Sequence, residues 1–313
     1  MKINRQDDIN KDLGLGTRVS QQSRMRYLNR DGSFNVTRKG LSFFRSLSLY
    51  HYLLTISWIK FFLYTALSYF VTNLVFAFSY VWAGPAALEG AAGISFLDKY
   101  IEAFFFSVQT LATIGYGKMS PTGLLANFIV AVEALVGLLG FALATGLLFA
   151  RFSRPNTKIV FSHQAVIAPY RGITAFEFRI ANERSNQLIE VEITVVISRN
   201  ETKGGSTERM FYGLPLERKK VMFFPLHLVV VHPIDPSSPL YGVTKEKFDT
   251  SEAEFLILIT GVDETFSQTV HARSSYRYDE VEWGYKFSDI YLPSDDAKIS
   301  IDMRRIHQIE PAK

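Results

Sequence analysis

Five consecutive residues, Thr113 to Gly117, have types that could replace the water around a metal cation. A cation that enters a medium of low dielectric constant loses on the order of 20 kcal/mol of hydration free energy, and rings of backbone carbonyls can compensate for that loss. Successive carbonyls point at one axis only if the chain alternates between ordinary and left-handed dihedrals, which Gly115 and Gly117 adopt at little cost. The Thr113 hydroxyl can add one further oxygen, and the β-branched Ile114 can pack behind the loop. The run therefore predicts a potassium filter.

The predicted ion ligands are oxygens of Thr113, Ile114, Gly115 and Tyr116, with K⁺ as the permeant ion and no cofactor. The alternative is a glycine-rich turn that matches a filter by chance. A motif of this kind needs its structural context. Here a short apolar stretch comes directly before the run, and a long apolar segment lies on each side of it. This context favours the filter over the turn.

The composition is that of a chain with two different parts. A length of 313 residues suggests about two domains. Residues 59–83 and 122–150 are almost free of charge, whereas residues 155–313 alternate like a β protein. The sequence has no cysteine, which excludes disulfides and cysteine-ligated metals. A net charge of +4, without a basic stripe that includes stacking aromatics, predicts no nucleic-acid partner. The first 40 residues lack the apolar core of a cleavable signal peptide.

Residues 59–83 are predicted to form an outer transmembrane helix, because about 20 apolar residues cross a bilayer. Lys60 can extend to the interface at its start, and Tyr80 and Trp82 fit an aromatic belt at its end. Gly84-Pro85 is expected to stop this helix.

Residues 98–112 are predicted to form a pore helix that is too short to span the membrane and therefore re-enters. Its C-terminal dipole would direct partial negative charge toward the path of the cation. The filter, residues 113–117, follows it. Ser120-Pro121 is then expected to be the N-cap and first residue of an inner helix over 121–150.

Residues 43–58 are predicted to form an interfacial slide helix. At 100° per residue, one apolar stripe contains Phe43, Leu47, Tyr50, Leu54 and Trp58. An amphipathic helix directly before a membrane span most simply lies in the interface plane. The alternative is that these residues are the first turns of a longer transmembrane helix.

The remaining regions are predicted to form an N-terminal segment, 1–42, and a β-sandwich domain, 155–313. Residues 1–23 have no periodicity and suggest a mobile tail, and residues 24–40 suggest an edge strand on the C-terminal domain. Residues 176–180 and 189–195 alternate with period two, whereas the stretches Val221 to His232 and Glu254 to Thr260 are more continuously apolar. Short strands separated by turn signals indicate a sandwich.

Positive charge at the outer ends of both spans predicts that both termini are cytoplasmic. The charges are Arg38, Lys39, Arg45 and Lys60 at the first span, and Arg151, Arg154 and Lys158 at the second. Two spans with one re-entrant loop agree with this prediction, because an even number of crossings leaves both termini on the same side.

A single filter per chain cannot surround an ion, so a closed ring of four identical chains is expected. The inner helices would then line the pore, and Phe141, Thr145 and Phe149 share one helical face at i, i+4 and i+8. Four Phe149 rings would make a constriction that gates by dewetting. The alternative is that Phe149 faces lipid.

Glu133 is the one charge inside the second span, and an intramembrane acid is by default a functional hypothesis. Its alternative is a protonated or hydrogen-bonded carboxyl that packs behind the filter.

Gly137, Gly140 and Gly146 permit either bending or close helix approach. The sequence does not choose between bending and close approach for these glycines.

Taken together, the chain resembles prokaryotic inward-rectifier potassium (KirBac-type) channels from about Arg26 to Glu310. The resemblance is carried by these motifs: Arg30-Asp31-Gly32-Ser33, Ser107-Val108-Gln109-Thr110 before the filter, Ala150-Arg151-Phe152-Ser153-Arg154-Pro155, His232-Pro233-Ile234-Asp235, Ser238-Pro239-Leu240-Tyr241, Ala272-Arg273-Ser274-Ser275-Tyr276 and Trp283-Gly284. Together they are highly specific to that family.

The resemblance implies a multi-domain membrane protein: a homotetrameric pore of slide, outer, pore and inner helices with an immunoglobulin-like cytoplasmic β-sandwich. It also implies a multi-pass protein of the cell inner membrane. Phe149 falls where the family has its bundle-crossing blocker, and residues 264–271 resemble its second constriction. The expected function is a potassium-selective inward-rectifier-type channel that is gated at the bundle crossing and by the cytoplasmic domain.

The chain departs from its eukaryotic relatives at several positions. Gln109 and Lys118 replace a pore-helix Glu and an Arg after the filter, and Phe141 replaces the acid of strong rectifiers. The resemblance therefore does not extend to tight block by polyamines or magnesium at Phe141, and Glu133 is a weaker candidate for the same role. The candidate residues for anionic or phosphoinositide lipid headgroups are Lys60, Arg151, Arg154 and Lys158, at about 1 kcal/mol for each juxtamembrane charge.

Other classes of function fit the sequence less well. A membrane sensor with a non-conducting pore would not need an intact filter, and a transporter subunit would carry several degenerate filter repeats. The histidines show no metal-ligand spacing, and no Ser-His-Asp or phosphate-binding loop pattern is present, so an enzyme is not expected.

Overall fold

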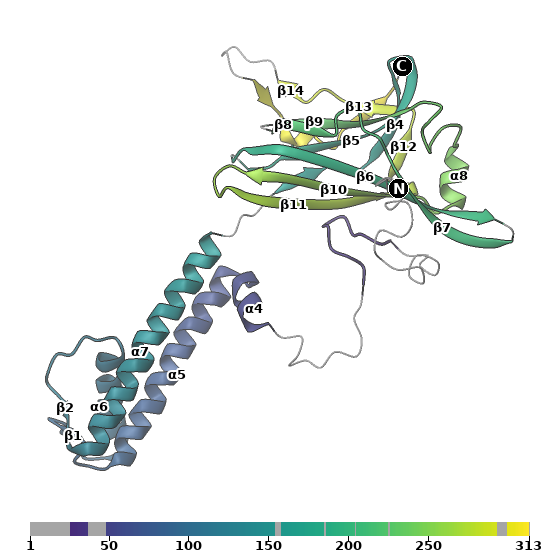
Figure 1. Ribbon diagram of the computed structural model, residues 1–313. Coiled ribbons are helices and arrows are strands. Elements are labelled where there is room, and N and C mark those ends of the chain that lie inside the picture. The colour runs from purple at the N-terminus through teal and green to yellow at the C-terminus, as the bar shows by residue number, and fades with distance from the viewer. Residues whose placement is uncertain are drawn as a thin grey trace, which may run out of the picture. The chain divides into compact units, whose positions relative to one another are not determined.

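The structure is a computed structural model that describes residues 26–36, 48–153, 158–184, 186–203, 205–224, 226–292 and 299–312. The chain divides into two compact units: Lys39–Arg154, and Met1–Arg38 together with Pro155–Lys313. The first unit is helical and the second is built of strands (Figure 1). The predictions for residues 1–23 and for the start of the slide helix, 43–47, lie outside the described residues.

The helical unit begins with α4, Leu49–Thr55, followed by α5, Trp58–Ala83. Ile56 and Ser57 are extended, with ψ of 161° and 154°, so the two helices are separate. The assignment of Trp58 to the interfacial helix is wrong, because Ser57 caps a new helix by accepting from the Lys60 amide. α5 ends where Gly84 adopts a φ of 114°.

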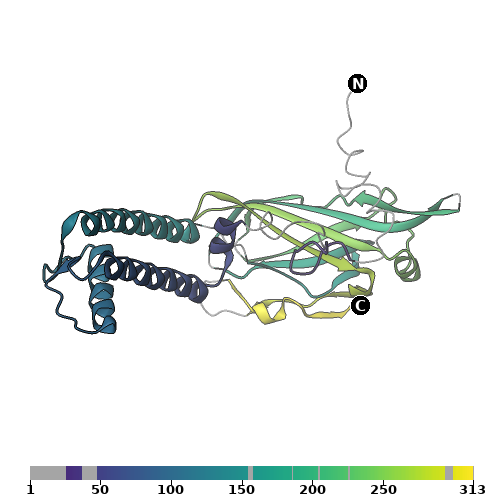
Figure 2. The same ribbon diagram turned by 90° about the horizontal axis from the view of Figure 1, so that it is seen from below.

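The short helix α6, Phe96–Leu111, packs against both α5 and α7, Gly123–Phe152 (Figures 1 and 2). A capping box formed by Ser95 and Asp98 starts α6 two residues before the predicted position. The prediction that Ser120-Pro121 opens the inner helix is wrong. These two residues form β2, which pairs with β1, Leu88–Glu89, and α7 begins after Thr122.

Both α5 and α7 are long and apolar enough to cross a membrane, with mean hydropathies of 1.6 and 2.2 over their most apolar windows. α6, at 16 residues, is shorter than such a span. The helical unit therefore has two candidate membrane spans with a short helix between them in sequence.

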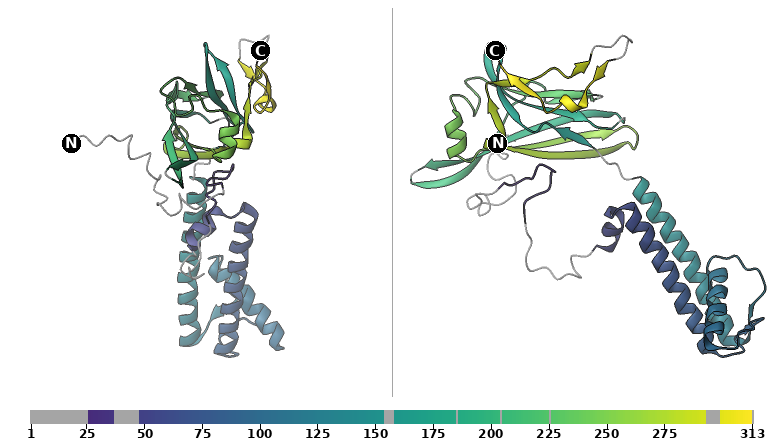
Figure 3. Two further views of the ribbon diagram at one scale, coloured as in Figure 1. Left: turned by 90° about the vertical axis from the view of Figure 1, so that its right-hand side faces the viewer. Right: turned by 180° about the vertical axis from the view of Figure 1, so that it is seen from behind.

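The β unit is a sandwich of two five-stranded sheets (Figure 3). One sheet has the order β11-β10-β6-β7, with β8 also on β6, and the other has the order β12-β4-β5-β3, with β9 also on β5. The strands of the first are β6 Leu188–Lys203, β7 Ser206–Gly213, β8 Lys220–Phe224, β10 Glu254–Asp263 and β11 Gln268–Arg277. Those of the second are β3 Ile159–Phe161, β4 Ala165–Tyr170, β5 Ile173–Asn182, β9 His227–Ile234 and β12 Val281–Trp283.

Shorter elements complete the unit. They are α8 Lys245–Thr250, the 3₁₀ turns η1 Tyr278–Glu280 and η2 Met303–Arg305, and two small ladders formed by β13 Tyr285–Phe287 with β16 Ile309–Pro311 and by β14 Tyr291–Leu292 with β15 Ser300–Ile301.

The core of the sandwich lies between the two sheets. Phe176 of β5 stacks on Phe255 of β10, with ring centroids 4.0 Å apart, and Phe178 packs beside them. The continuously apolar stretch 221–232 contains two strands on different sheets, β8 and β9. Its first part is largely exposed, with Met222 and Phe223 68% and 62% exposed.

The outer face of β5 is also covered, which period-two alternation alone does not predict. Arg179 donates to the Ser288 carbonyl at 2.7 Å and to the Arg305 carbonyl at 3.3 Å. Ile290 and Ile306 pack on Ala181. The C-terminal segment therefore covers Arg179 and Ala181, and Glu177 on the same strand is also buried.

Burial raises the pKa of Glu177 to about 7, with Arg179 opposing the rise and Glu217 adding to it. Because the folded-state pKa lies above the ordinary value, the folded state binds more protons between about pH 4.5 and pH 7, and stability falls as pH rises through that window. We expect Glu177→Gln to raise the free energy of unfolding by about 1–3 kcal/mol at pH 8 and to have little effect at pH 4.5. Thermal melting of both proteins at the two pH values measures this. An equal shift in melting temperature at the two pH values would contradict this expectation.

The segment before the membrane unit docks on the edge of the sandwich, but not as the predicted edge strand. Its backbone forms only an isolated bridge within itself, Leu28 to Phe34. The Glu254 carboxylate accepts hydrogen bonds from the Tyr27 and Leu28 amides, and Arg26 bonds to Ser275. Side chains therefore hold this segment, because the alternating pattern at Phe34 and Val36 is too short to make a sheet ladder.

Candidate functional site

The backbone of residues 113–117 alternates in handedness. Thr113, Gly115 and Gly117 have φ values of 57°, 59° and 78°, whereas Ile114 and Tyr116 between them do not have positive φ. Left-handed Gly115 and Gly117 follow from their residue type. Thr113 is a left-handed residue that the sequence does not reveal, because a β-branched residue rarely adopts this conformation.

The end of α6 fixes the start of this loop. The Thr113 amide donates to the Thr110 carbonyl at 3.0 Å, and the Ile114 amide donates to the Gln109 carbonyl at 2.7 Å. Within the part of the chain that the structure describes, no group donates to the carbonyl oxygens of residues 113–116. Those oxygens are therefore available to a ligand outside the chain.

A buried polar cluster joins α5, α6 and α7 behind this loop. Glu133 is fully buried, and its carboxyl bonds to the hydroxyls of Tyr80 and Ser107. The Ser107 hydroxyl also lies 3.0 Å from Asn73 Oδ1, and the Asn73 amide nitrogen donates to the Tyr69 carbonyl. The cluster therefore ties each of the three helices to the other two.

Proton counting in this cluster favours a neutral Glu133. The bond to the Tyr69 carbonyl fixes Asn73 Oδ1 as the acceptor that faces Ser107. A serine hydroxyl has one proton, so Ser107 donates it to Asn73. The proton in the contact between Ser107 and Glu133 must then come from the carboxyl. The interpretation of Glu133 as a hydrogen-bonded carboxyl that packs behind the filter is the one that this geometry favours.

Tyr80, Asn73 and Ser107 are residues that the sequence reasoning did not connect to Glu133. A signal was available, because Asn73 and Tyr80 are seven residues apart and therefore share one face of α5. Asn73 is also the one amide side chain in residues 59–83, an otherwise largely apolar span.

Gly137 has a defined packing role. A Cβ at this position would lie 2.5 Å from the Leu111 carbonyl oxygen, so a larger residue would push α7 away from the end of α6. For Gly137 the structure therefore favours close approach over bending. Gly140 and Gly146 meet nothing within 4 Å in this chain, which leaves both alternatives open for them.

The three predicted pore-lining residues are all exposed on α7. Phe141 and Phe149 are 77% and 73% exposed, and Thr145 is exposed between them. Tyr116 in the loop is 77% exposed. These side chains are thus not used in packing within their own chain, so they can face either a pore or lipid.

The predicted lipid-binding residues have different environments. Arg151 is buried, with its guanidinium donating to the Leu53 and Ile56 carbonyls at the end of α4 and lying over the rings of Trp58 and Phe61. It is therefore already bound within the chain rather than free to bind a headgroup.

The other candidates are Lys60, Lys158 and Arg154. Lys60 is exposed, and Lys158 is 3.6 Å from a carboxylate oxygen of Glu183. Arg154 lies outside the described residues. Lys158 and Lys60 belong to different units.

Among the described residues, no group of three or more His, Asp or Glu side chains is arranged to hold a metal ion. The histidines have local structural contacts instead. His232 lies between the Pro215 carbonyl and the Ser238 hydroxyl, and burial lowers its pKa.

Two membrane-spanning helices, a short helix that ends in a left-handed alternating loop, and a β-sandwich define a two-span channel architecture with an appended β domain. The family model for the inward rectifier potassium channel C-terminal domain matches residues 159–313, and the model described as "Ion channel" matches residues 47–154.

Individual relatives agree with these matches. "Inward rectifier potassium channel Kirbac3.1" from Paramagnetospirillum magnetotacticum is 44% identical over 91% of this chain and 95% of its own length. "G protein-activated inward rectifier potassium channel 3" from Mus musculus is 28% identical over 92% of this chain and 78% of its own length. "Inward rectifier potassium channel 4" from Homo sapiens is 29% identical over 72% of this chain, which spans about half (54%) of that relative. The chain belongs to the inward rectifier potassium channel family, and the predicted fold class is confirmed.

Proposed function

We propose that four copies of this chain form a potassium-selective pore, with the carbonyl oxygens of residues 113–116 replacing the hydration shell of the ion. The observation that carries the proposal is the alternation of left-handed φ at 113, 115 and 117. A chain that alternates in this way turns successive carbonyls to one side, and rings of such carbonyls select K⁺. One loop supplies one side of such a ring, so the pore needs symmetry-related copies.

The exposure of α7 also supports an assembly. Only 6% of its most apolar window is buried within the chain. A helix that is apolar on all sides needs lipid or other helices around it. In a ring of four chains, one face of each α7 would line the pore, and the neighbouring chains and lipid would cover the rest.

Ion flux into liposomes tests the proposal. The purified protein should take up rubidium, exclude sodium and be blocked by barium, because rubidium fits sites built for potassium. Sodium uptake equal to rubidium uptake would contradict selectivity. A complete absence of barium-sensitive uptake would instead favour the alternative function, a membrane sensor with a non-conducting pore.

The exposed face of α7 supports a gate at Phe149. Phe149 lies one turn from the end of this helix, and a ring of four such side chains would close the pore by dewetting. The β10–β11 turn, in the segment 264–271, would form a second constriction. Both termini would be cytoplasmic in the cell inner membrane, in line with the basic residues at the two outer ends of the spans.

Anionic lipid would act through Lys60, which is exposed, and through the charge of Arg154 in the sequence. Neutralising Lys60 and Arg154 together should change the dependence of rubidium flux on anionic lipid, because each juxtamembrane charge contributes about 1 kcal/mol. Arg151→Gln should instead lower stability by about 1–3 kcal/mol, because it removes two hydrogen bonds to the α4 carbonyls. Flux against lipid composition and thermal melting separate the two effects. An unchanged lipid dose curve for the double variant would remove these residues from the lipid site.

A further inference from the structure

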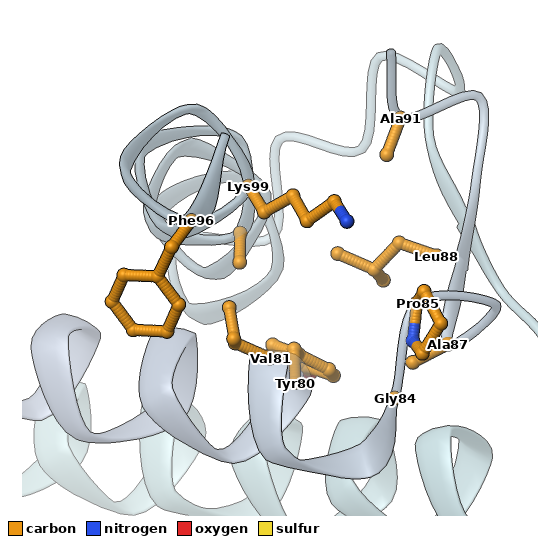
Figure 4. Close-up of a pocket in the computed structure, with 10 residues that line it drawn as sticks. Tyr80, Val81, Gly84, Pro85, Ala87, Leu88, Ala91, Phe96 and Lys99 are labelled. Atoms are coloured by element: carbon orange, nitrogen blue, oxygen red, sulfur yellow. The ribbon is translucent and has the colours of Figure 1, made fainter. Parts of the chain in front are cut away.

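A cavity of about 300 Å³ lies at the end of α5 that is farther from α4 (Figure 4). Its walls come from the last turns of α5, the loop that follows it and the first turns of α6. Buried Tyr80 and Leu88 line its interior, and exposed Ala91 and Phe96 lie at its margin. This volume is at the lower end of the range for small-molecule sites, which are mostly apolar with a few polar groups.

The charged group among the residues that line this cavity is the ammonium of Lys99. The Lys99 side chain is half-buried and extends across the cavity toward Leu88 and Ala91 (Figure 4). Within the described residues it has neither a hydrogen bond nor an ion pair. The acids closest to it in sequence are used elsewhere: Asp98 bonds to Ser95, and Glu102 accepts from the Ala92 and Gly93 amides. The cavity therefore has an uncompensated positive charge.

The surroundings of the cavity indicate where its ligand comes from. Trp82, Ile94 and Phe96 are 73%, 91% and 67% exposed. Trp82 belongs to the last turn of α5, a helix that is long and apolar enough to span the membrane, and Phe96 at the start of α6 lines the cavity. A tryptophan at the end of a span is typical of the membrane–water interface. The margin of the cavity is therefore apolar and at headgroup level.

We propose that this cavity binds an anionic membrane phospholipid, with the phosphate on the Lys99 ammonium and the first acyl carbons against the apolar walls. Charge complementarity selects an anionic lipid over a zwitterionic one. Because Tyr80 lines the cavity and also donates to Glu133, the occupant would contact the cluster that holds the three helices together behind residues 113–117. The site is at the opposite end of α5 from Arg151 and Lys60. Lipid binding there does not require that the protein conducts ions.

Lipid retention by the purified full-length protein tests this site. The protein is exchanged into detergent with phosphatidylglycerol or phosphatidylcholine, and retained lipid is counted by native mass spectrometry. Lys99→Gln removes the charge, and Ala91→Trp places an indole at the margin of the cavity. Lys118→Gln and Ala92→Trp are matched controls, because both positions are exposed and neither lines the cavity.

We expect Lys99→Gln to weaken phosphatidylglycerol retention about fivefold, the factor that corresponds to about 1 kcal/mol for one lysine. Ala91→Trp should weaken it as well, while both controls retain lipid like the parent protein. Equal retention by the parent, Lys99→Gln and Ala91→Trp would overturn the proposal and would fit a cavity closed by a second copy of the chain. Equal retention of the two lipids, or displacement by inorganic phosphate alone, would also overturn it.

Discussion

Liposomes containing the Gly115→Asp variant should take up no more rubidium than protein-free liposomes. Gly115 has a φ of 59°, a conformation that L-residues with a side chain adopt at a cost of roughly 1–2 kcal/mol. A return to ordinary dihedrals would turn the neighbouring carbonyls away from the axis that the alternation defines. In the proposed tetramer the change, including its added carboxylate, occurs four times around one ion path. The effect on flux should therefore be complete.

Gly172→Asp is the matched control for this variant. Gly172 also has a positive φ, 84°, and an added Cβ at either glycine would meet nothing within 4 Å in the chain. It lies in the turn between β4 and β5, in the other unit. We expect this variant to lose some stability but to keep barium-sensitive rubidium uptake. Normal uptake by Gly115→Asp would remove residues 113–117 from the ion path.

Glu133→Leu should destabilise the protein by about 2–6 kcal/mol, whereas Glu133→Gln should be tolerated. Leucine leaves the Tyr80 hydroxyl buried without its partner and removes one of the two contacts of the Ser107 hydroxyl, at about 1–3 kcal/mol each. Glutamine can replace a neutral acid, because its amide nitrogen donates to Ser107 and its oxygen accepts from Tyr80. Thermal melting and rubidium uptake of the two variants measure the difference.

The comparison of these two variants also tests the protonation state of Glu133. If the carboxyl were ionised, it could only accept, and the amide of Gln would place a donor where an acceptor is required. Glu133→Gln would then be about as damaging as Glu133→Leu. That result would contradict the proton count. Tyr80→Phe, which removes one of the two bonds to the carboxyl, should give an intermediate loss of stability.

The architecture was predictable because it depends on long, strongly patterned segments. Two apolar stretches of more than 20 residues, each with a single charge, and a series of period-two strands leave few alternatives in a protein of this length. Gly115 and Gly117 were predictable for a different reason, since the backbone conformation restricts the residue type. The family resemblance relied on motifs spread along both units, and the matches of the two family models confirm it.

The features that sequence reasoning missed depend on contacts between segments that are distant in the chain. The β1–β2 ladder at Ser120-Pro121 exists because the loop after α5 meets it, and a Ser-Pro pair by itself is also a good helix start. Arg151 was predicted from its charge to bind lipid, whereas the end of α4 offers it carbonyls and aromatic rings. The partners of Glu133 come from two other helices, and only the packing shows which ones.

The most direct test of the account is a density map of the purified protein in potassium-containing lipid bilayers. The account predicts four chains around one axis, with the carbonyl oxygens of residues 113–116 directed at that axis and ion density between successive rings. A monomeric particle, or a map in which these oxygens turn away from any shared axis, would contradict it.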